Sequence, residues 1–123
     1  MSTTTLNLVE GFPIGDRKLK KVTLRSNTTA DHIECMELAE KMVMTEAGPE
    51  LVASPSVMGM AMLARQIVKI DDHDGPLTIE ELKKLEPVDF SLIQAESEVL
   101  AIADEKAASK AVAQRGRTDK PGR

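Results

Sequence analysis

Alternating apolar and polar residues at the start of the chain predict a β-hairpin over residues 4–25. Leu6 and Leu8 lie on the same side of an extended strand, with a polar residue between them. A Pro-Ile-Gly-Asp turn signal follows, and Val22 and Leu24 then share one face of a second strand. Because an isolated hairpin is only marginally stable in water, we expect this apolar face to cover the helices that follow.

Three helix-start signals divide the rest of the chain. Thr28 with Asp31, and Thr78 with Glu81, have the spacing of capping boxes. Ser54 precedes a proline, a pair typical of a helix N-cap and the first helical position. Apolar residues recur at helical spacing after each signal and again near the C-terminus. The predicted helices span about residues 29–47, 55–69, 78–85 and 88–114.

Together these patterns predict an α+β fold. An N-terminal antiparallel β-hairpin is followed by three to four α-helices in a small, mostly helical domain. We expect residues 1–111 to form this single domain. Residues 112–123 are basic and lose the apolar periodicity, which is typical of a disordered tail.

The composition narrows the classes of function. Aromatic residues make up 2% of the 123 residues, with no Tyr or Trp, so the chain lacks stacking platforms for nucleic acid bases. The basic second strand comes without a reading helix, and we therefore expect no specific nucleic-acid recognition. The longest uncharged run, residues 51–64, is too short to cross a bilayer. The first residues lack the pattern of a secretion signal, and a single cysteine, Cys35, suits a reducing compartment.

Charge is strongly segregated along the chain. Residues 1–25 carry five basic and two acidic residues, residues 26–105 carry five and seventeen, and residues 106–123 carry six and one. An acidic body between basic ends can associate with itself or with a basic partner, and salt weakens such association. A solvated acidic surface with a disordered basic tail would give the same pattern.

The acidic loop between the second and third predicted helices matches a calcium-binding loop only in part. With Gly75 at the sixth position, Asp72, Asp74 and Glu81 fall at ligand positions. Ile70 then occupies the first position, where an oxygen ligand is required. Since helix capping already explains Glu81, we expect no calcium site. The sequence shows no catalytic constellation, His-rich cluster or phosphate-binding glycine loop, and we predict a non-enzymatic protein without a cofactor or metal.

Methionine is concentrated on the first two predicted helices. Six of the seven Met residues lie there: Met36, Met42, Met44, Met58, Met60 and Met62. Flexible Met side chains fill irregular cores, and they also line surfaces that bind varied apolar helices. The sequence leaves both interpretations open, a core that is short of aromatic residues and a groove for a partner helix.

The order of these segments resembles a known family. The hairpin contains Leu6-Asn-Leu-Val9, Phe12-Pro-Ile14 and Leu19-Lys-Lys-Val-Thr-Leu-Arg25, followed by Thr29-Ala-Asp31. Further along are Met62-Leu-Ala-Arg65, Leu77-Thr-Ile-Glu-Glu-Leu and Leu85-Glu-Pro-Val-Asp-Phe90. Over residues 6 to 100, this series is similar to the tail assembly chaperones of contractile-tailed phages and their prophages, the Mu-like and P2-like group.

The resemblance implies a chaperone that binds the long, helix-rich tape-measure protein. It would keep that protein soluble while tail-tube subunits polymerise around it. Tail-tube subunits and a longer, frameshifted form of the chain itself are further partners that the resemblance implies. It also implies a location in the cytoplasm of the bacterial host and absence from the mature virion.

We predict that the second helix carries the partner-binding grip. A chaperone of this kind needs flexible apolar side chains, which this helix offers at Met58, Met62, Leu63 and Ile67. Two other classes of function remain as alternatives. The chain would otherwise be a structural tail or tail-completion protein of the virion, or a small regulatory binding protein.

Overall fold

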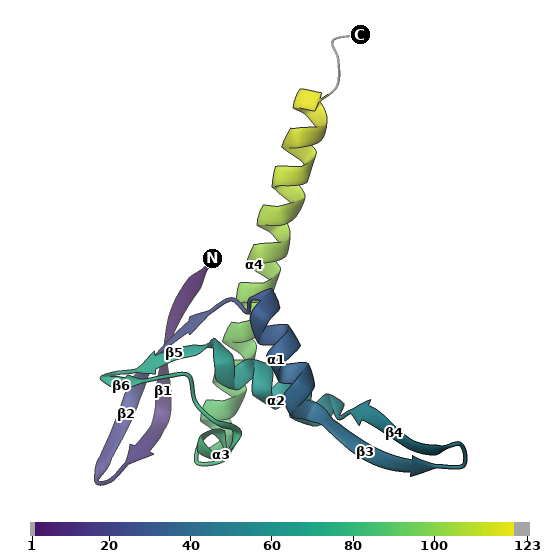
Figure 1. Ribbon diagram of the computed structural model, residues 1–123. Coiled ribbons are helices and arrows are strands. Elements are labelled where there is room, and N and C mark those ends of the chain that lie inside the picture. Colours follow the sequence, from purple (N-terminus) through teal and green to yellow (C-terminus); the bar gives the residue numbers. More distant parts are fainter. Residues whose placement is uncertain (1, 120–123) are drawn as a thin grey trace.

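The computed structural model describes residues 2–119 and begins with the expected hairpin (Figure 1). Strands β1 (Thr3–Ile14) and β2 (Arg17–Arg25) pair antiparallel, and the tight turn between them places Gly15 at a φ of 57°. These strands belong to a four-stranded antiparallel sheet in the order β1–β2–β5–β6. The predicted N-terminal hairpin and the α+β fold class are confirmed.

The sheet and the helices share an apolar core. The predicted inner face of the hairpin is buried, including Leu8, Val22 and Leu24. Fully burying a side chain of this kind contributes about 1.5–3 kcal/mol. The buried core residues are Leu8, Phe12, Leu19, Val22, Leu24, Leu63, Ala64, Ile67, Ile70, Leu77, Leu82, Leu85, Ile93 and Leu100.

Helix α1 (Thr29–Ala39) begins with the predicted capping box. The Asp31 N–H donates to Thr28 Oγ1 at 3.1 Å, and the Thr28 N–H donates to Asp31 Oδ2 at 2.9 Å. The prediction of a helix through residue 47 is wrong. Helix α1 ends at Ala39, and the chain turns directly into strand β3 (Glu40–Thr45).

Strands β3 and β4 (Gly48–Ala53) form a separate two-stranded sheet that projects from the body, here called the arm (Figure 1). β-Branched Val43, Thr45 and Val52 favour extended backbone over helix. Gly48 adopts a φ of 113°, which suits glycine, and Thr45 Oγ1 donates to its carbonyl at 2.6 Å. These local preferences outweigh the helical spacing of the apolar residues.

Helix α2 (Pro55–Gln66) starts where the cap signal predicts. Ser54 Oγ accepts from the Val57 N–H at 3.4 Å. The predicted continuation to residue 69 is wrong, because the helix ends at Gln66.

Residues after α2 form strand β5 (Ile67–Ile70), which pairs antiparallel with β2. Leu24 lies opposite Ile67, and Val22 lies opposite Ile70. The edge of β2 that does not pair with β1 offers backbone donors and acceptors to residues 67–70. These hydrogen bonds would not form if α2 continued as a helix. Both isoleucines are fully buried in the core, so side-chain packing also favours the strand over a longer helix.

The rest of the described chain contains β6 (His73–Asp74), the short helix α3 (Ile79–Leu82) and the long helix α4 (Pro87–Asp119). The Thr78–Glu81 capping box is formed as predicted. Residues 112–119, predicted as part of a disordered tail, continue α4, and residues 120–123 lie outside the described residues. The distal half of α4 extends well beyond the body (Figure 1).

Asp89 anchors the start of α4 to β1. The strand bulges here, and three consecutive backbone N–H groups donate to the Asp89 carboxylate. The shortest distances are 2.6 Å from Val9, 3.1 Å from Glu10 and 2.8 Å from Gly11. Gly11 has a φ of 98°, and a Cβ there would lie only 3.0 Å from Lys18 Cβ. The bulge therefore forms a backbone cradle for a fully buried carboxylate.

Candidate partner-binding surface

The four residues predicted to form the partner-binding grip differ in their solvent exposure. Met58 and Met62 are half-buried. Leu63 is 6% exposed and Ile67 is fully buried, both within the core. The structure therefore removes Leu63 and Ile67 from any surface available to a partner, because the face of α2 that carries Leu63 packs inward and Ile67 belongs to β5.

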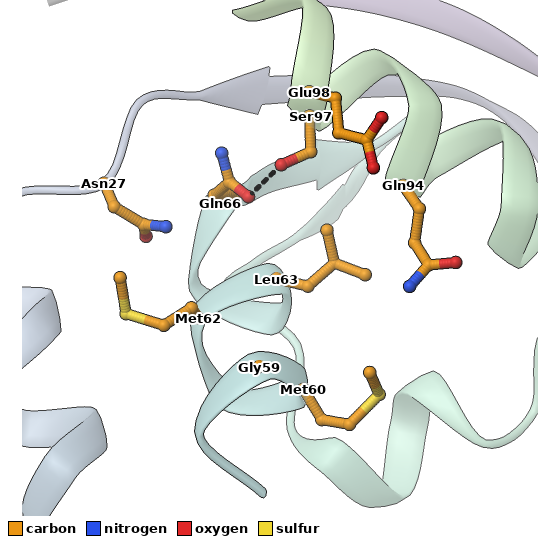
Figure 2. A pocket seen from close by; sticks show the side chains of 9 residues that line it. All are labelled: Asn27, Gly59, Met60, Met62, Leu63, Gln66, Gln94, Ser97 and Glu98. Carbon is orange, nitrogen blue, oxygen red and sulfur yellow. Dashed lines mark hydrogen bonds between the residues drawn. The ribbon is translucent and has the colours of Figure 1, made fainter. Parts of the chain in front are cut away.

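A small cavity lies between α2 and α4 (Figure 2). It has a volume of about 270 Å³. Leu63 lies at its centre, with Met60 on one side and the Gln66–Ser97 hydrogen bond of 2.6 Å on the other. Gln66 Nε2 also donates to the Arg25 carbonyl at 3.2 Å, so this side chain ties β2 to α4. The lining residues are Asn27, Gly59, Met60, Met62, Leu63, Gln66, Gln94, Ser97 and Glu98.

Of the large apolar side chains that the structure describes, three of the four most exposed lie on the arm. Met42 is 61% exposed, Met44 is 75% exposed and Leu51 is also exposed. Met42 is paired across the ribbon with Leu51, and Met44 with Pro49. Cross-strand partners in an antiparallel pair lie on the same face, so these four residues form one apolar face of the arm.

Helix α1 adds apolar surface next to the base of the arm. Ile33, Met36 and Leu38 are all exposed, and the last turn of α1 leads directly into β3. The β4 strand returns to the body at Ser54, whose N–H donates to the Ala39 carbonyl at 3.0 Å. The arm therefore leaves the body at the junction of α1 and α2.

An ion-pair cluster fixes the first turn of α1, at the end of this helix that lies away from the arm. Arg25 donates two hydrogen bonds to Asp31, at 2.6 and 3.1 Å, and Arg65 pairs with Glu34 and lies 3.7 Å from Asp31 Oδ1. The hydrogen bond from Arg25 holds the pKa of the buried Asp31 carboxyl well below its usual value, and the Thr28 N–H acts in the same direction. The cluster joins β2, α1 and α2.

The acidic loop is used for structural contacts. Asp72 forms an ion pair with Arg17 at 3.0 Å, and Glu81 Oε1 accepts from the Thr78 N–H at 3.0 Å. His73 lies 3.5 Å from Glu81 Oε2. Within residues 2–119, no group of three His, Cys, Asp or Glu side chains is placed to hold a metal ion.

Cys35 is fully buried on α1. Burial raises the pKa of its thiol, which disfavours the reactive thiolate. The part of the chain that the structure describes also contains no helix with the length and apolarity needed to span a membrane.

Sequence reasoning missed the arm and the Asp89 cradle. The β-branched residues at 43, 45 and 52 and the Gly48-Pro49 pair were signals for the arm, but the helical spacing of nearby apolar residues masked them. The cradle has no local signal, since Asp89 and its three donors are about 80 residues apart.

An exposed apolar arm beside an apolar helix is typical of a protein that acts by contacting other proteins. Comparison with known proteins specifies the class. The chain matches the family model of the tail assembly protein gp41 over residues 8–117. It therefore belongs to the tail assembly protein gp41 family, and its role lies in phage tail assembly.

Individual relatives agree with this family. The chain is 39% identical to the probable tail assembly protein gp41 of Escherichia phage Mu over 102 residues, which cover 80% of this chain and 71% of that protein. It is 33% identical over 115 residues to the Mu-like prophage FluMu protein gp41 of Haemophilus influenzae, covering 93% and 87%. A match to the probable tail assembly protein FS-gp41 of phage Mu, 39% identical over 102 residues, covers 80% of this chain but only 54% of that longer protein. No solved structure matches the chain.

Proposed function

We propose that this chain is a tail assembly chaperone that binds the tape-measure protein and keeps it soluble until the tail tube forms around it. Membership of a tail assembly family supports the setting. The apolar face of the arm is the observation that carries the chaperone role. A long, helix-rich protein exposes apolar helical faces before assembly, and such faces aggregate unless another surface covers them.

The arm suits a partner that presents many similar apolar faces. Met42, Met44 and Leu51 extend into solvent on a narrow ribbon that makes little contact with the body. Unbranched Met side chains adapt to differently shaped surfaces, so one grip can bind successive segments of a long partner. Met58 and Met62 would extend this grip onto α2, which begins two residues after β4.

The first test is co-expression with the tape-measure protein of the same phage, followed by a solubility assay and a pulldown. We expect the wild-type chain to keep the tape-measure protein soluble and to co-purify with it. Met42→Asp combined with Met44→Asp is expected to abolish both effects, because charge on the arm face disfavours apolar contact. Met58→Asp combined with Met62→Asp tests the α2 part of the grip separately.

A control uses Val112→Asp, which places a negative charge on an exposed apolar site of α4 away from the arm. Circular dichroism should show that each variant keeps its fold. If the arm variant is folded and still solubilises the tape-measure protein, the proposed grip is wrong. If the wild type fails to bind, the chaperone role itself is wrong.

The location of the protein separates the chaperone from a structural component. We expect the chain in the cytoplasm of infected cells and not in purified particles. Mass spectrometry of purified virions measures this directly. Detection at the stoichiometry of a tail subunit would favour the alternative of a structural tail or tail-completion protein.

A further inference from the structure

The sulfur-containing side chains of this chain differ widely in their access to solvent. Cys35 is fully buried on α1, so its thiol is kept from reagents in the solvent. Met58, Met60 and Met62 on α2 are half-buried, and Met60 packs against the core. Among residues 2–119, the exposed methionines are therefore those of α1 and of strand β3 in the arm.

The two methionines of β3 are the more exposed. Met42 is 61% exposed and Met44 is 75% exposed, whereas Met36 on α1 is 43% exposed. Because successive side chains of a strand alternate between its two faces, Met42 and Met44 lie on the same face, about 7 Å apart along the strand. Their cross-strand partners on that face are Leu51 and Pro49. Two of the four residues of the apolar arm face are therefore exposed thioethers.

A thioether is a soft, polarisable group that a peroxide can oxidise. Hydrogen peroxide transfers one oxygen atom to the sulfur, so an S–O bond forms while the peroxide O–O bond breaks and water leaves. The sulfur gives up two electrons, and the peroxide accepts them. The product, methionine sulfoxide, is polar, and methionine sulfoxide reductases return it to methionine. Since the peroxide must reach the sulfur atom, exposed methionines react before half-buried ones.

We propose that Met42 and Met44 form an oxidation-sensitive modification site, at which hydrogen peroxide converts both thioethers of the free chain to sulfoxides and thereby prevents the arm from binding the tape-measure protein. This inference rests on the proposed chaperone function, whose grip is the same face. Two sulfoxides place polar oxygen atoms in an apolar contact, where a polar group without a hydrogen-bond partner is costly. Of the four residues of this face, Leu51 and Pro49 alone then remain apolar. Reduction of the sulfoxides restores the face, so the modification is reversible.

The order of oxidation is tested on the purified full chain alone. Hydrogen peroxide is added under native conditions, and peptide mapping by mass spectrometry follows the sulfoxide at each methionine. Met42 and Met44 should oxidise several-fold faster than Met58, Met60 and Met62. The far-ultraviolet circular dichroism should stay unchanged, because no core side chain is modified. Equal rates on the arm and on α2, or unfolding of the chain on oxidation, would overturn the proposal.

The effect on binding is measured with only this chain oxidised. After the peroxide has been removed, the tape-measure protein is diluted from urea into the oxidised or the untreated chain, and the amount that stays soluble and co-purifies is determined. The oxidised wild type should bind at least ~10-fold more weakly than the untreated wild type. Treatment with methionine sulfoxide reductases A and B, which act on the two sulfoxide epimers, should restore binding.

Two variants separate the arm from other sites of oxidation. Met42→Leu combined with Met44→Leu removes both sulfur atoms from the arm and keeps its side chains apolar. Met36→Leu is the matched control, because it removes an exposed thioether that lies off the arm face. For each variant, binding after peroxide treatment is divided by binding before it. This ratio should stay near one for the arm variant and should fall for Met36→Leu as it does for the wild type.

The results distinguish this modification from the chaperone function itself. Undiminished binding by a wild type that is oxidised at both arm methionines would overturn the proposal. Loss of binding by the peroxide-treated arm variant, or no recovery after complete reduction of the wild type, would also overturn it. A wild type that fails to bind even before oxidation would instead contradict the proposed chaperone function.

Discussion

At the scale of single residues, two carboxylates organise the molecule. Asp89 fastens α4 to the β1 bulge through three backbone donors, and Asp31 joins the helix cap of α1 to Arg25. Both are buried, so their hydrogen bonds offset the cost of removing a carboxylate from water. Both also belong to the motifs from which the family resemblance was drawn, which indicates that those motifs record structural needs.

Replacing Asp89 by Asn should destabilise the protein strongly. The amide keeps one acceptor but turns its NH2 group toward backbone donors, leaving at least one buried N–H without a partner. We expect a loss of about 3 kcal/mol in the free energy of unfolding, measured by urea denaturation. Asp16→Asn in the exposed hairpin turn is the control and should change stability by less than ~0.5 kcal/mol. An unchanged denaturation midpoint for Asp89→Asn would contradict the role of the cradle.

Asp31 should make stability depend on pH in the acid range. Its pKa is lowered in the folded state, chiefly by the hydrogen bond from Arg25. Its contribution is therefore complete above the unfolded pKa of about 3.9 and is lost as pH falls toward the lower folded value. Asp31→Asn should reduce stability at neutral pH and flatten the loss below about pH 4.

Thermal unfolding between neutral and acid pH measures this effect. Asp72→Asn is a suitable comparison, because that residue also has a lowered pKa through Arg17 but lies exposed to solvent, where ion pairs contribute little. Equal acid sensitivity of the wild type and Asp31→Asn would rule out the assignment.

At the scale of elements, the arm and strand β5 differ in how strongly the rest of the protein stabilises them. The arm is a two-stranded ribbon with an exposed apolar face, and such a ribbon gains little stability by itself. Strand β5, by contrast, is held by pairing with β2 and by two fully buried isoleucines. The first element is therefore suited to binding and the second to stability.

Polar substitution on the arm should leave folding stability nearly unchanged. Met42→Ser combined with Met44→Ser removes side chains that are already exposed, so the free energy of unfolding should change by less than ~0.5 kcal/mol. Leu63→Ala in the core should cost about 2–5 kcal/mol. Chemical denaturation of both variants provides the comparison. A large loss of stability in the Met variant would mean that the arm packs against the body.

At the scale of the whole molecule, a compact core carries two projections. The arm leaves at the junction of α1 and α2, and the distal half of α4 leaves at the other end of the body (Figure 1). Neither projection contributes a residue to the described core, and the last core residue along α4 is Leu100. Their surfaces are thus available to partners without disturbing the fold.

Deleting residues 106–123 should leave the folding of the body intact. The side chains of residues 106–113 are exposed, so the free energy of unfolding should stay within ~0.5 kcal/mol of that of the full chain. Urea denaturation of the full and truncated chains measures this difference. A large loss of stability in the truncated chain would show that the distal helix supports the core.

The sequence by itself determined the elements whose signals are local. The capping boxes at Thr28 and Thr78, the cap at Ser54 and the alternation of the first hairpin each act within a few residues. These features are present in the structure. Local signals succeed because helix caps and tight turns satisfy backbone groups of immediate neighbours.

Only the tertiary structure decided where the apolar helices stop and which of their residues remain exposed. Ile67 leaves helical conformation because β2 offers it a strand partner, and Asp89 finds its donors about 80 residues away. For Met58, Met62 and Leu63, a helix that is apolar nearly all round does not specify which side meets the core. Burial in a shared core depends on contacts between distant segments, and those contacts favour one among several locally acceptable conformations.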